Sequence, residues 1–200
     1  CSGTHGHIVG IGGVCGEVVS MNSRMTEPTV IEWLGRLADA DGTPLHLSRF
    51  RAAEPEAGVR PRATTLLSLG ASMNAGKTTT AAQVIRSLAS AGFRVAAAKI
   101  TGTACVKDPN FLGDAGAAPV LDFTHTGWPS TAGCSGRELL GVAATLRAAL
   151  EATGPDFVVI EIADGIVQRE TALLLADPGF RASIDAVLFA GPDALSCDAG

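Results

Sequence analysis

The spacing of apolar residues changes near residue 62 and divides the chain into two parts. After this point, runs of β-branched and aliphatic residues alternate with segments whose apolar side chains recur every three or four positions. This pattern is typical of buried strands alternating with amphipathic helices, and it predicts right-handed βαβ units around a parallel sheet, an α/β fold. The predicted strands are residues 64–69, 93–100, 119–123, 156–162 and 185–190.

Two helices are predicted between these strands. In residues 77–90 the apolar side chains fall on one face, and Gly92 supplies the glycine that commonly ends a helix. The second helix begins at Ser135 and Glu138, which have the spacing of a capping box, and it ends before Gly154.

The first 60 residues show a weaker and mixed pattern. Short apolar runs predict strands at 8–11 and 17–19, and apolar residues at helical spacing predict a helix over 26–40. An alternating segment at 45–50 predicts a further strand. Because the start of the chain is rich in glycine, we expect a small glycine-rich module here.

A linker is predicted between the two parts. Residues 52–61 contain two prolines, one glycine and mixed charges without periodicity. We therefore expect a small module over residues 1–60 and an α/β domain over residues 61–200. The chain begins with Cys1 rather than Met, so either an initiator methionine was removed or the sequence begins inside a longer protein. Only a turn follows the last predicted strand, which would also fit a piece of a longer protein.

Composition excludes several classes of protein. With 200 residues, of which 46% are hydrophobic and 18% charged, the chain can bury a sizeable core and is not disordered. The net charge of -5 offers no basic surface for nucleic acid or for an acidic membrane. No apolar run reaches the roughly 18 residues that a membrane span needs. We expect neither nucleic acid nor membrane as a partner.

The five cysteines are scattered and show no C-x-x-C spacing, which favours a reduced, cytoplasmic protein over a disulfide framework. Cys1, His5, His7 and Cys15 are residue types that bind zinc, but their spacing matches no common zinc module. We therefore expect solvent-facing histidines in a glycine-rich segment.

The strongest chemical signal is the segment GASMNAGKTT, which runs from Gly70 to Thr79 between a predicted strand and a predicted helix. In that context backbone amides and the positive helix end can hold phosphate, Lys77 can reach its outer oxygens and Thr78 can ligate Mg²⁺. In the usual motif G-x-x-x-x-G-K-[ST] the first glycine would fall at position 71, which is Ala71 here. The glycine of this chain lies one place earlier, at Gly70. The alternative is an ordinary strand-to-helix turn. The predicted nucleotide-binding residues are Ser72, Met73, Asn74, Ala75, Gly76, Lys77, Thr78 and Thr79.

Beyond the loop, the chain resembles one branch of the P-loop NTPases, namely the dethiobiotin synthetases, the amidating cobyric acid synthases and their relatives. The resemblance covers about residues 66–190. It rests on Lys99 in AAAKITG, Asp114 in GDAGA and Glu161 in VVIEIADG. It implies that Asp114 and Glu161 hold Mg²⁺ together with Thr78, and that Lys99 faces the substrate and the γ-phosphate.

The residues themselves point to the same edge of the sheet, because ligands of open parallel sheets bind beyond the carboxyl ends of the strands. Lys77, Lys99 and Glu161 are therefore the expected catalytic residues. Each position could also have a purely structural role: Lys99 could be a solvated lysine at a strand end, and Asp114 could cap a helix. Glu161 follows an apolar strand directly, where a carboxylate without a cation or donors is costly to bury.

Substrate-binding residues are predicted less specifically. The segment 122–131 is dense in hydroxyl groups and could be either a substrate loop or a structural polar loop. Arg169 could hold a phosphate or a carboxylate, although an arginine on a helix surface is more common. The candidate substrate residues are Thr101, Asp122, Ser130, Thr131, Asp164 and Arg169.

These signals predict an enzyme that uses ATP and Mg²⁺ to activate, through the γ-phosphate, a small anionic substrate of the carboxylate or carbamate type. Such an enzyme would be a ligase or phosphotransferase, like dethiobiotin synthetase, and the resemblance makes a homodimer one expected assembly. The alternative is a nucleotide-dependent switch, either a partitioning-type ATPase or a GTPase, that acts on a protein partner. Ser72 stands where switch ATPases of this branch often carry a second lysine, which favours the enzyme. No guanine-reading N-K-x-D occurs in the chain.

Overall fold

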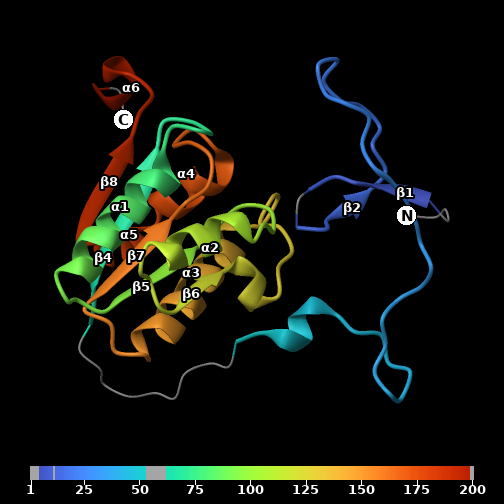
Figure 1. The fold of residues 1–200 in the computed structure, drawn as a ribbon, viewed down its shortest axis with the longest axis horizontal. Coiled ribbons are helices and arrows are strands. Elements are labelled where there is room, and N and C mark those ends of the chain that lie inside the picture. Colours follow the sequence, from blue (N-terminus) through green and yellow to red (C-terminus); the bar gives the residue numbers. More distant parts are fainter. Residues whose placement is uncertain (1–4, 11, 53–61, 199–200) are drawn as a thin grey trace.

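A computed structural model describes residues 5–10, 12–52 and 62–198 (Figure 1). Its centre is a five-stranded parallel sheet with the strand order β6-β5-β7-β4-β8. The predicted α/β fold is confirmed, and each strand lies within or next to its predicted range. The strands are β4 (Thr64–Gly70), β5 (Val95–Lys99), β6 (Val120–Asp122), β7 (Phe157–Glu161) and β8 (Ala186–Ala190).

Helices cover both faces of this sheet, as Figure 1 shows. On one face lie α1 (Lys77–Ser90) and α2 (Lys107–Asp114). On the other lie α3 (Gly136–Glu151), α4 (Arg169–Ala176) and α5 (Pro178–Ala182), while the short α6 (Ala194–Asp198) follows β8. Successive residues of a strand face opposite sides, so each central strand contributes to two hydrophobic clusters.

Both predicted helices are confirmed. Helix α1 has the predicted bounds and is followed by Gly92, whose φ of 89° places it in the left-handed region. Helix α3 begins with the expected capping box. The Ser135 hydroxyl accepts from the backbone N–H of Glu138, and the Glu138 carboxylate accepts from the N–H of Ser135 at 2.7 Å. None of the described helices is both long and apolar enough to cross a membrane.

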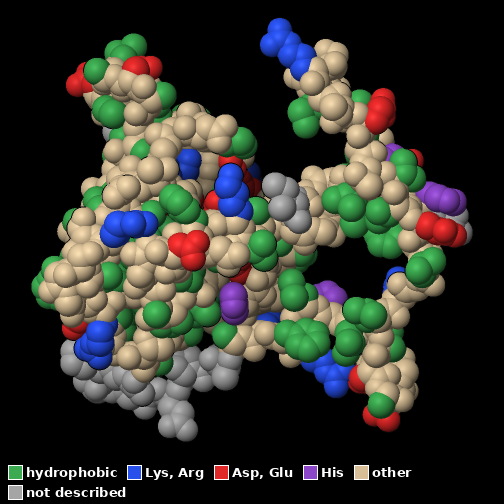
Figure 2. All heavy atoms as spheres, viewed as in Figure 1, with side chains coloured by type: hydrophobic (Ala, Val, Ile, Leu, Met, Phe, Trp, Pro, Cys, Tyr) green, Lys and Arg blue, Asp and Glu red, His purple; other side chains and the backbone are tan. Residues whose placement is uncertain are grey.

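The N-terminal residues form a separate antiparallel sheet with the order β2-β1-β3, beside the α/β domain (Figure 1). Its strands are β1 (His5–Ile8), β2 (Cys15–Gly16) and β3 (Val30–Glu32). We call residues 5–52 the N-terminal module. Its apolar side chains are largely exposed to solvent, as Figure 2 shows.

The helix predicted over residues 26–40 is wrong. The β-branched residues Val30 and Ile31 instead pair with β1. Leu34 and Leu37, which the helical pattern placed on a buried face, are 94% and 80% exposed. Helical spacing of a few apolar residues therefore did not indicate burial here.

Other predictions for this part also need correction. The alternating segment at 45–50 contains the 3₁₀ helix η1 (Leu47–Phe50), whose first turn is capped by His46. Strand β1 ends at Ile8, and β2 precedes the predicted range 17–19. Residue 11 and most of the predicted linker, 53–61, lie outside the described residues.

Candidate functional site

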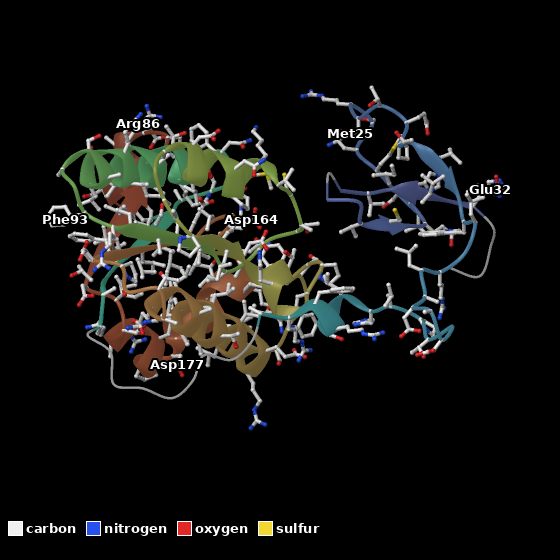
Figure 3. The ribbon with its side chains drawn as sticks, turned by 60° about the horizontal axis from the view of Figure 1, so that its bottom comes forward. Met25, Glu32, Arg86, Phe93, Asp164 and Asp177 are labelled. Carbon is white, nitrogen blue, oxygen red and sulfur yellow. The ribbon has the colours of Figure 1, made fainter. Side chains whose placement is uncertain are left out.

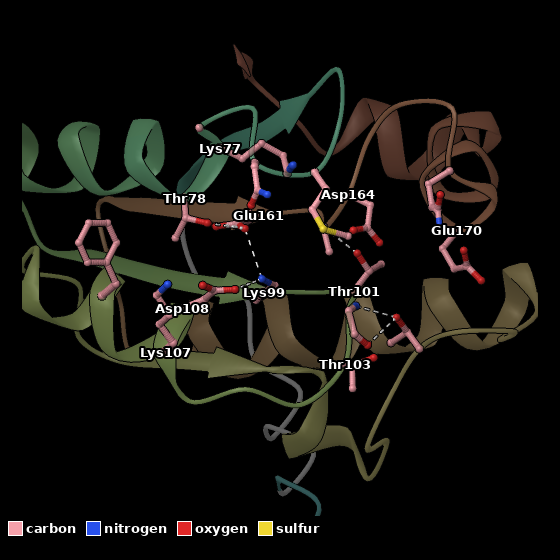
Figure 4. A pocket seen from close by; sticks show the side chains of 18 of the residues that line it. Lys77, Thr78, Lys99, Thr101, Thr103, Lys107, Asp108, Glu161, Asp164 and Glu170 are labelled. Carbon is pink, nitrogen blue, oxygen red and sulfur yellow. Dashed lines mark hydrogen bonds and ion pairs between the residues drawn. The ribbon is translucent and has the colours of Figure 1, made fainter. Parts of the chain in front are cut away.

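A cavity of about 740 Å³ opens at the carboxyl ends of the central strands (Figure 4). Four segments line it: the loop between β4 and α1, the segment from β5 into α2, residues 131–132, and the turn between β7 and α4. Parallel strands bring their carboxyl ends to one edge, which explains why residues so distant in sequence meet here. Six of the predicted loop residues line the cavity, namely Met73, Asn74, Gly76, Lys77, Thr78 and Thr79.

The loop before α1 has the shape that phosphate binding requires. Asn74 and Gly76 adopt left-handed backbone conformations, with φ of 61° and 102°. Gly76 is the N-cap of α1 and has no side chain to cap the helix, so the first backbone amides of α1 stay available for an anion. Lys77 is buried, and its Nζ donates to the carbonyl oxygen of Ser72 at 2.8 Å.

The shifted glycine of the motif has a steric reason. A Cβ on Gly70 would lie 2.7 Å from Cγ of Lys77 and 2.9 Å from the carbonyl oxygen of Ala190. The backbone of residue 70 therefore lies beneath the lysine side chain, and only glycine fits there. The departure from the usual spacing at Ala71 is compatible with the phosphate-binding interpretation.

Glu161, at the end of β7, is the centre of the site. Its side chain is 2% exposed. The hydroxyl of Thr78 donates to Oε1 at 3.0 Å, and Nζ of Lys99 lies 3.5 Å from the same oxygen. Burial raises the pKa of Glu161, and the charge of Lys99 and the hydrogen bond from Thr78 offset part of that rise.

The second oxygen of this carboxylate, Oε2, is buried and has no hydrogen-bond partner among the described residues. A buried, unpartnered carboxylate oxygen is unfavourable unless a cation or donor reaches it. Mg²⁺ prefers oxygen ligands and keeps several waters, so Glu161 and Thr78 fit such an ion. No three His, Cys, Asp or Glu side chains within the described ranges are grouped to hold a metal by themselves. Phosphate and water oxygens would therefore complete the shell.

Lys99 is held between two carboxylates (Figure 4). It forms ion pairs with Asp108 and with Glu161, and its side chain is only 13% exposed. Burial acts to lower the pKa of Lys99, but the two carboxylates outweigh it and the pKa lies above its ordinary value. Burial lowers the pKa of Lys77, opposed only in part by Glu161 and Asp164.

Asp108, which sequence reasoning missed, is the aspartate of this segment that lines the cavity. Residues 107–114 fold as α2, so Asp108 lies in the first turn beside Lys99. Asp114 is the last residue of that helix, about 9 Å farther along the axis, and is exposed outside the cavity. Its predicted role as a metal ligand is not supported. The signal in the sequence that could have found Asp108 is an acidic residue in the first turn of the helix that follows Lys99.

The turn after β7 is fixed against the phosphate loop. Asp164 adopts a left-handed conformation with φ of 62°. A Cβ on Gly165 would lie 2.3 Å from the carbonyl oxygen of Ala71. The N–H of Ile166 donates to the carbonyl oxygen of Gly70 at 3.0 Å. Figure 3 shows Asp164 at the end of the domain nearer the N-terminal module, whereas Phe93 lies at the opposite end.

The candidate substrate residues divide into two groups. Thr101, Thr131 and Asp164 line the cavity. Three neighbours that the sequence did not single out also line it, and these are Thr103, Lys107 and Glu170.

The other candidates serve the fold around the cavity. Asp122 caps the 3₁₀ helix η2 (Phe123–Thr126) and accepts from the N–H of Thr124 at 3.0 Å. Arg169 donates to the carbonyl oxygen of Cys134 at 3.0 Å, and Ser130 bonds to the Thr103 hydroxyl. Asp122, Ser130 and Arg169 lie outside the lining, as do Ser72 and Ala75.

No protein-family model and no curated protein matches the chain. The solved structures that it resembles include the signal recognition particle receptor FtsY from Elizabethkingia anophelis, with a TM-score of 0.41 and 19% identity over 72% of this chain and 46% of that one. A structure of the same receptor in complex with GDP gives a TM-score of 0.42 and 16% identity over 68% and 38%.

The chain thus spans less than half the length of either receptor structure. The order of strand, glycine-lysine-threonine loop and helix is a feature of this chain's own fold. The dethiobiotin synthetase branch stays a prediction from the sequence motifs.

Proposed function

We propose that the protein binds a nucleoside triphosphate with Mg²⁺ in this cavity and hydrolyses it, so that water takes the γ-phosphoryl group as phosphate and the nucleoside diphosphate leaves. One observation carries the proposal. The buried carboxylate of Glu161 meets the hydroxyl of Thr78 at 3.0 Å, directly after the loop lysine Lys77. A metal ligand, a phosphate-binding cation and free helix amides are therefore brought together at one point.

Each residue has a distinct task in this proposal. Lys77 would exchange its bond to the Ser72 carbonyl for phosphate oxygens. Thr78 and Glu161 would hold Mg²⁺, which neutralises charge on the phosphates, and Asp108 and Lys99 would set the charge balance beside it. Positioning and charge stabilisation of this kind are the main contributions to phosphoryl transfer. ATP as the specific nucleotide remains the prediction from the sequence.

A switch is the output that the geometry favours. The turn 163–166 is hydrogen-bonded to Gly70 and packs on Ala71, so a change in the phosphate loop reaches the start of α4 directly. Val167, next to that turn, is 88% exposed. A protein partner in contact with this turn would sense such a change.

Transfer to a small molecule is the second candidate. The cavity continues beyond the phosphate loop to the hydroxyls of Thr101, Thr103 and Thr131, which leaves room for an acceptor. Lys99 is already paired with two carboxylates and is not a free cation for an anionic acceptor. Among the lysines that line the cavity, Lys107 is the one that could bind an anionic acceptor.

Calorimetric titration with ATP and with GTP, each with Mg²⁺, tests the proposal. Wild-type protein should bind one of them, and Lys77→Ala should abolish binding while the circular dichroism spectrum stays unchanged. Arg86→Ala, an exposed change on the same helix, is the control and should bind normally. Normal binding by Lys77→Ala would contradict the proposal. Hydrolysis stimulated by metabolite mixtures, but not by protein fractions, would favour the second candidate.

A further inference from the structure

The connection between β1 and β2 of the N-terminal module rests on the segment that follows β5. A Cβ on Gly12 would lie only 1.8 Å from the carbonyl oxygen of Ala104. A Cβ on Gly10 would lie 3.3 Å from Cγ2 of Thr103. Contact this close is possible at Gly12 because glycine has no side chain. Figure 1 shows this connection pointing toward the α/β domain, and we call its described residues, 9–10 and 12–14, the glycine hairpin.

The segment beneath the hairpin is part of the cavity wall. Thr101, Gly102 and Thr103 all line the cavity. The hydroxyl of Thr101, which is buried, accepts from the N–H of Ala163 at 2.8 Å. Ala163 begins the turn that packs on the phosphate loop. Residues 101–104 therefore contact this turn at one end and the glycine hairpin at the other.

The same segment leads directly into α2. Asp108, four positions after Ala104, forms the ion pair with Lys99, which in turn contacts Glu161. A phosphate and Mg²⁺ entering the cavity would compete for these charged groups. A shift of Asp108 would then be carried along a short stretch of chain to Ala104, under Gly12.

Hydrogen bonds tie this segment to its neighbours. The hydroxyl of Thr131 accepts from the N–H of Gly102 at 2.8 Å, and the N–H of Ala104 donates to the carbonyl oxygen of Pro129 at 2.9 Å. A second contact between module and domain lies at η2, where the N–H of Ala52 donates to the carbonyl oxygen of His125 at 2.7 Å. Ala52 and His125 do not line the cavity.

We propose that the glycine hairpin couples the nucleotide site to the N-terminal module. Filling the cavity rearranges the pairing of Lys99, Asp108 and Glu161, and residues 101–104 transmit that change to Gly12. This inference rests on the proposed function. Coupling between two sites is reciprocal, so displacing the hairpin changes nucleotide affinity by the same factor by which nucleotide shifts the hairpin.

A matched pair of variants tests the coupling. Gly12→Ala places a methyl group against the Ala104 carbonyl, whereas Gly16→Ala on β2 enters open space at an ordinary φ. We expect Gly12→Ala to change the affinity for a non-hydrolysable ATP or GTP analogue with Mg²⁺ by about five-fold or more. Gly16→Ala should stay within two-fold of wild type. Equal affinities for Gly12→Ala and wild type would overturn the inference.

Hydrogen exchange of the wild-type chain gives an independent test that needs no variant to fold. Deuterium uptake of peptides covering residues 5–16 should change when the analogue and Mg²⁺ are bound. Unchanged uptake, with binding shown by calorimetry on the same sample, would overturn the inference and leave the proposed function standing. If the wild type bound neither analogue, the proposed function would fail and the inference with it.

Discussion

Thr78 donates a hydrogen bond to Glu161 across 83 positions of the chain, with 3.0 Å between Oγ1 and Oε1. The contact is possible because β4, which leads into the loop of Thr78, pairs with β7, which ends at Glu161. Ser68 and Glu161 are register partners in these two strands. The hydrogen bond thus joins the first turn of α1 to a buried carboxylate at the edge of the sheet.

Glu161 should make the stability of the protein depend on pH. Burial raises its pKa above 4.5, so the folded state binds this proton more tightly than the unfolded state. The contribution of Glu161 to the free energy of unfolding is therefore largest below pH 4.5 and falls as the pH rises to the folded pKa. Glu161→Gln removes this dependence. Urea unfolding of both proteins between pH 4 and 8, without Mg²⁺, measures the difference, and a constant difference would argue against the shift.

Asp108 and Asp114 lie on the same helix, so they form a matched pair. Asp108→Asn removes one of the two carboxylate partners of Lys99 beside the proposed metal site, and should lower Mg²⁺-dependent nucleotide hydrolysis by roughly ten- to a hundred-fold. Asp114→Asn changes an exposed residue at the far end of α2 and should stay within two-fold of wild type. Steady-state rates at several Mg²⁺ concentrations provide the measurement. The opposite order of effects would restore Asp114 as the metal ligand.

Gly70→Ala should interfere with the loop lysine. The added methyl group would lie 2.7 Å from Cγ of Lys77, so the side chain must move from its position. We expect a loss of about 1–3 kcal/mol in the free energy of unfolding, as for other overpacked sites, together with weaker nucleotide binding. Ala71→Gly, which restores the usual motif, is the control and should bind nucleotide like the wild type. Unimpaired Gly70→Ala would show that the loop tolerates a side chain there.

Two leucines distinguish the predicted helix over residues 26–40 from the observed structure. Leu34 is 94% exposed, so Leu34→Ala should change the free energy of unfolding by less than about 0.5 kcal/mol. Leu146, in α3, is fully buried, so the same substitution there should cost about 2–5 kcal/mol. Thermal or urea unfolding measures both. A large loss for Leu34→Ala would indicate that this side chain is covered in solution.

Much of the α/β domain was determined by local signals in the sequence. Apolar runs set the strands, the capping box of Ser135 and Glu138 set the start of α3, and Gly92 marked the end of α1. The position of the loop before Lys77, between a strand and a helix, was also predicted correctly from the sequence. These features depend on interactions between residues a few positions apart, and such interactions can be predicted from the sequence.

The N-terminal module shows where that reasoning fails. Val30 and Ile31 have apolar neighbours at helical spacing, yet they pair with β1, whose residues lie more than twenty positions earlier. Strand formation in a short segment depends on a partner elsewhere in the chain, so propensity and periodicity carry little information about it. The exposure of Leu34 could not be read from its own segment.

The identity of the aspartate beside Lys99 was likewise decided by the tertiary structure, which places Asp108 there and not the predicted Asp114. The sequence by itself established that an acidic residue follows Lys99 at the edge of the sheet. Which one reaches the lysine depends on where α2 begins and how it packs on β5 and β6, because six residues of helix separate the two carboxylates by about 9 Å. Local pattern determines the type of chemistry, and the packing of distant segments determines which atoms meet.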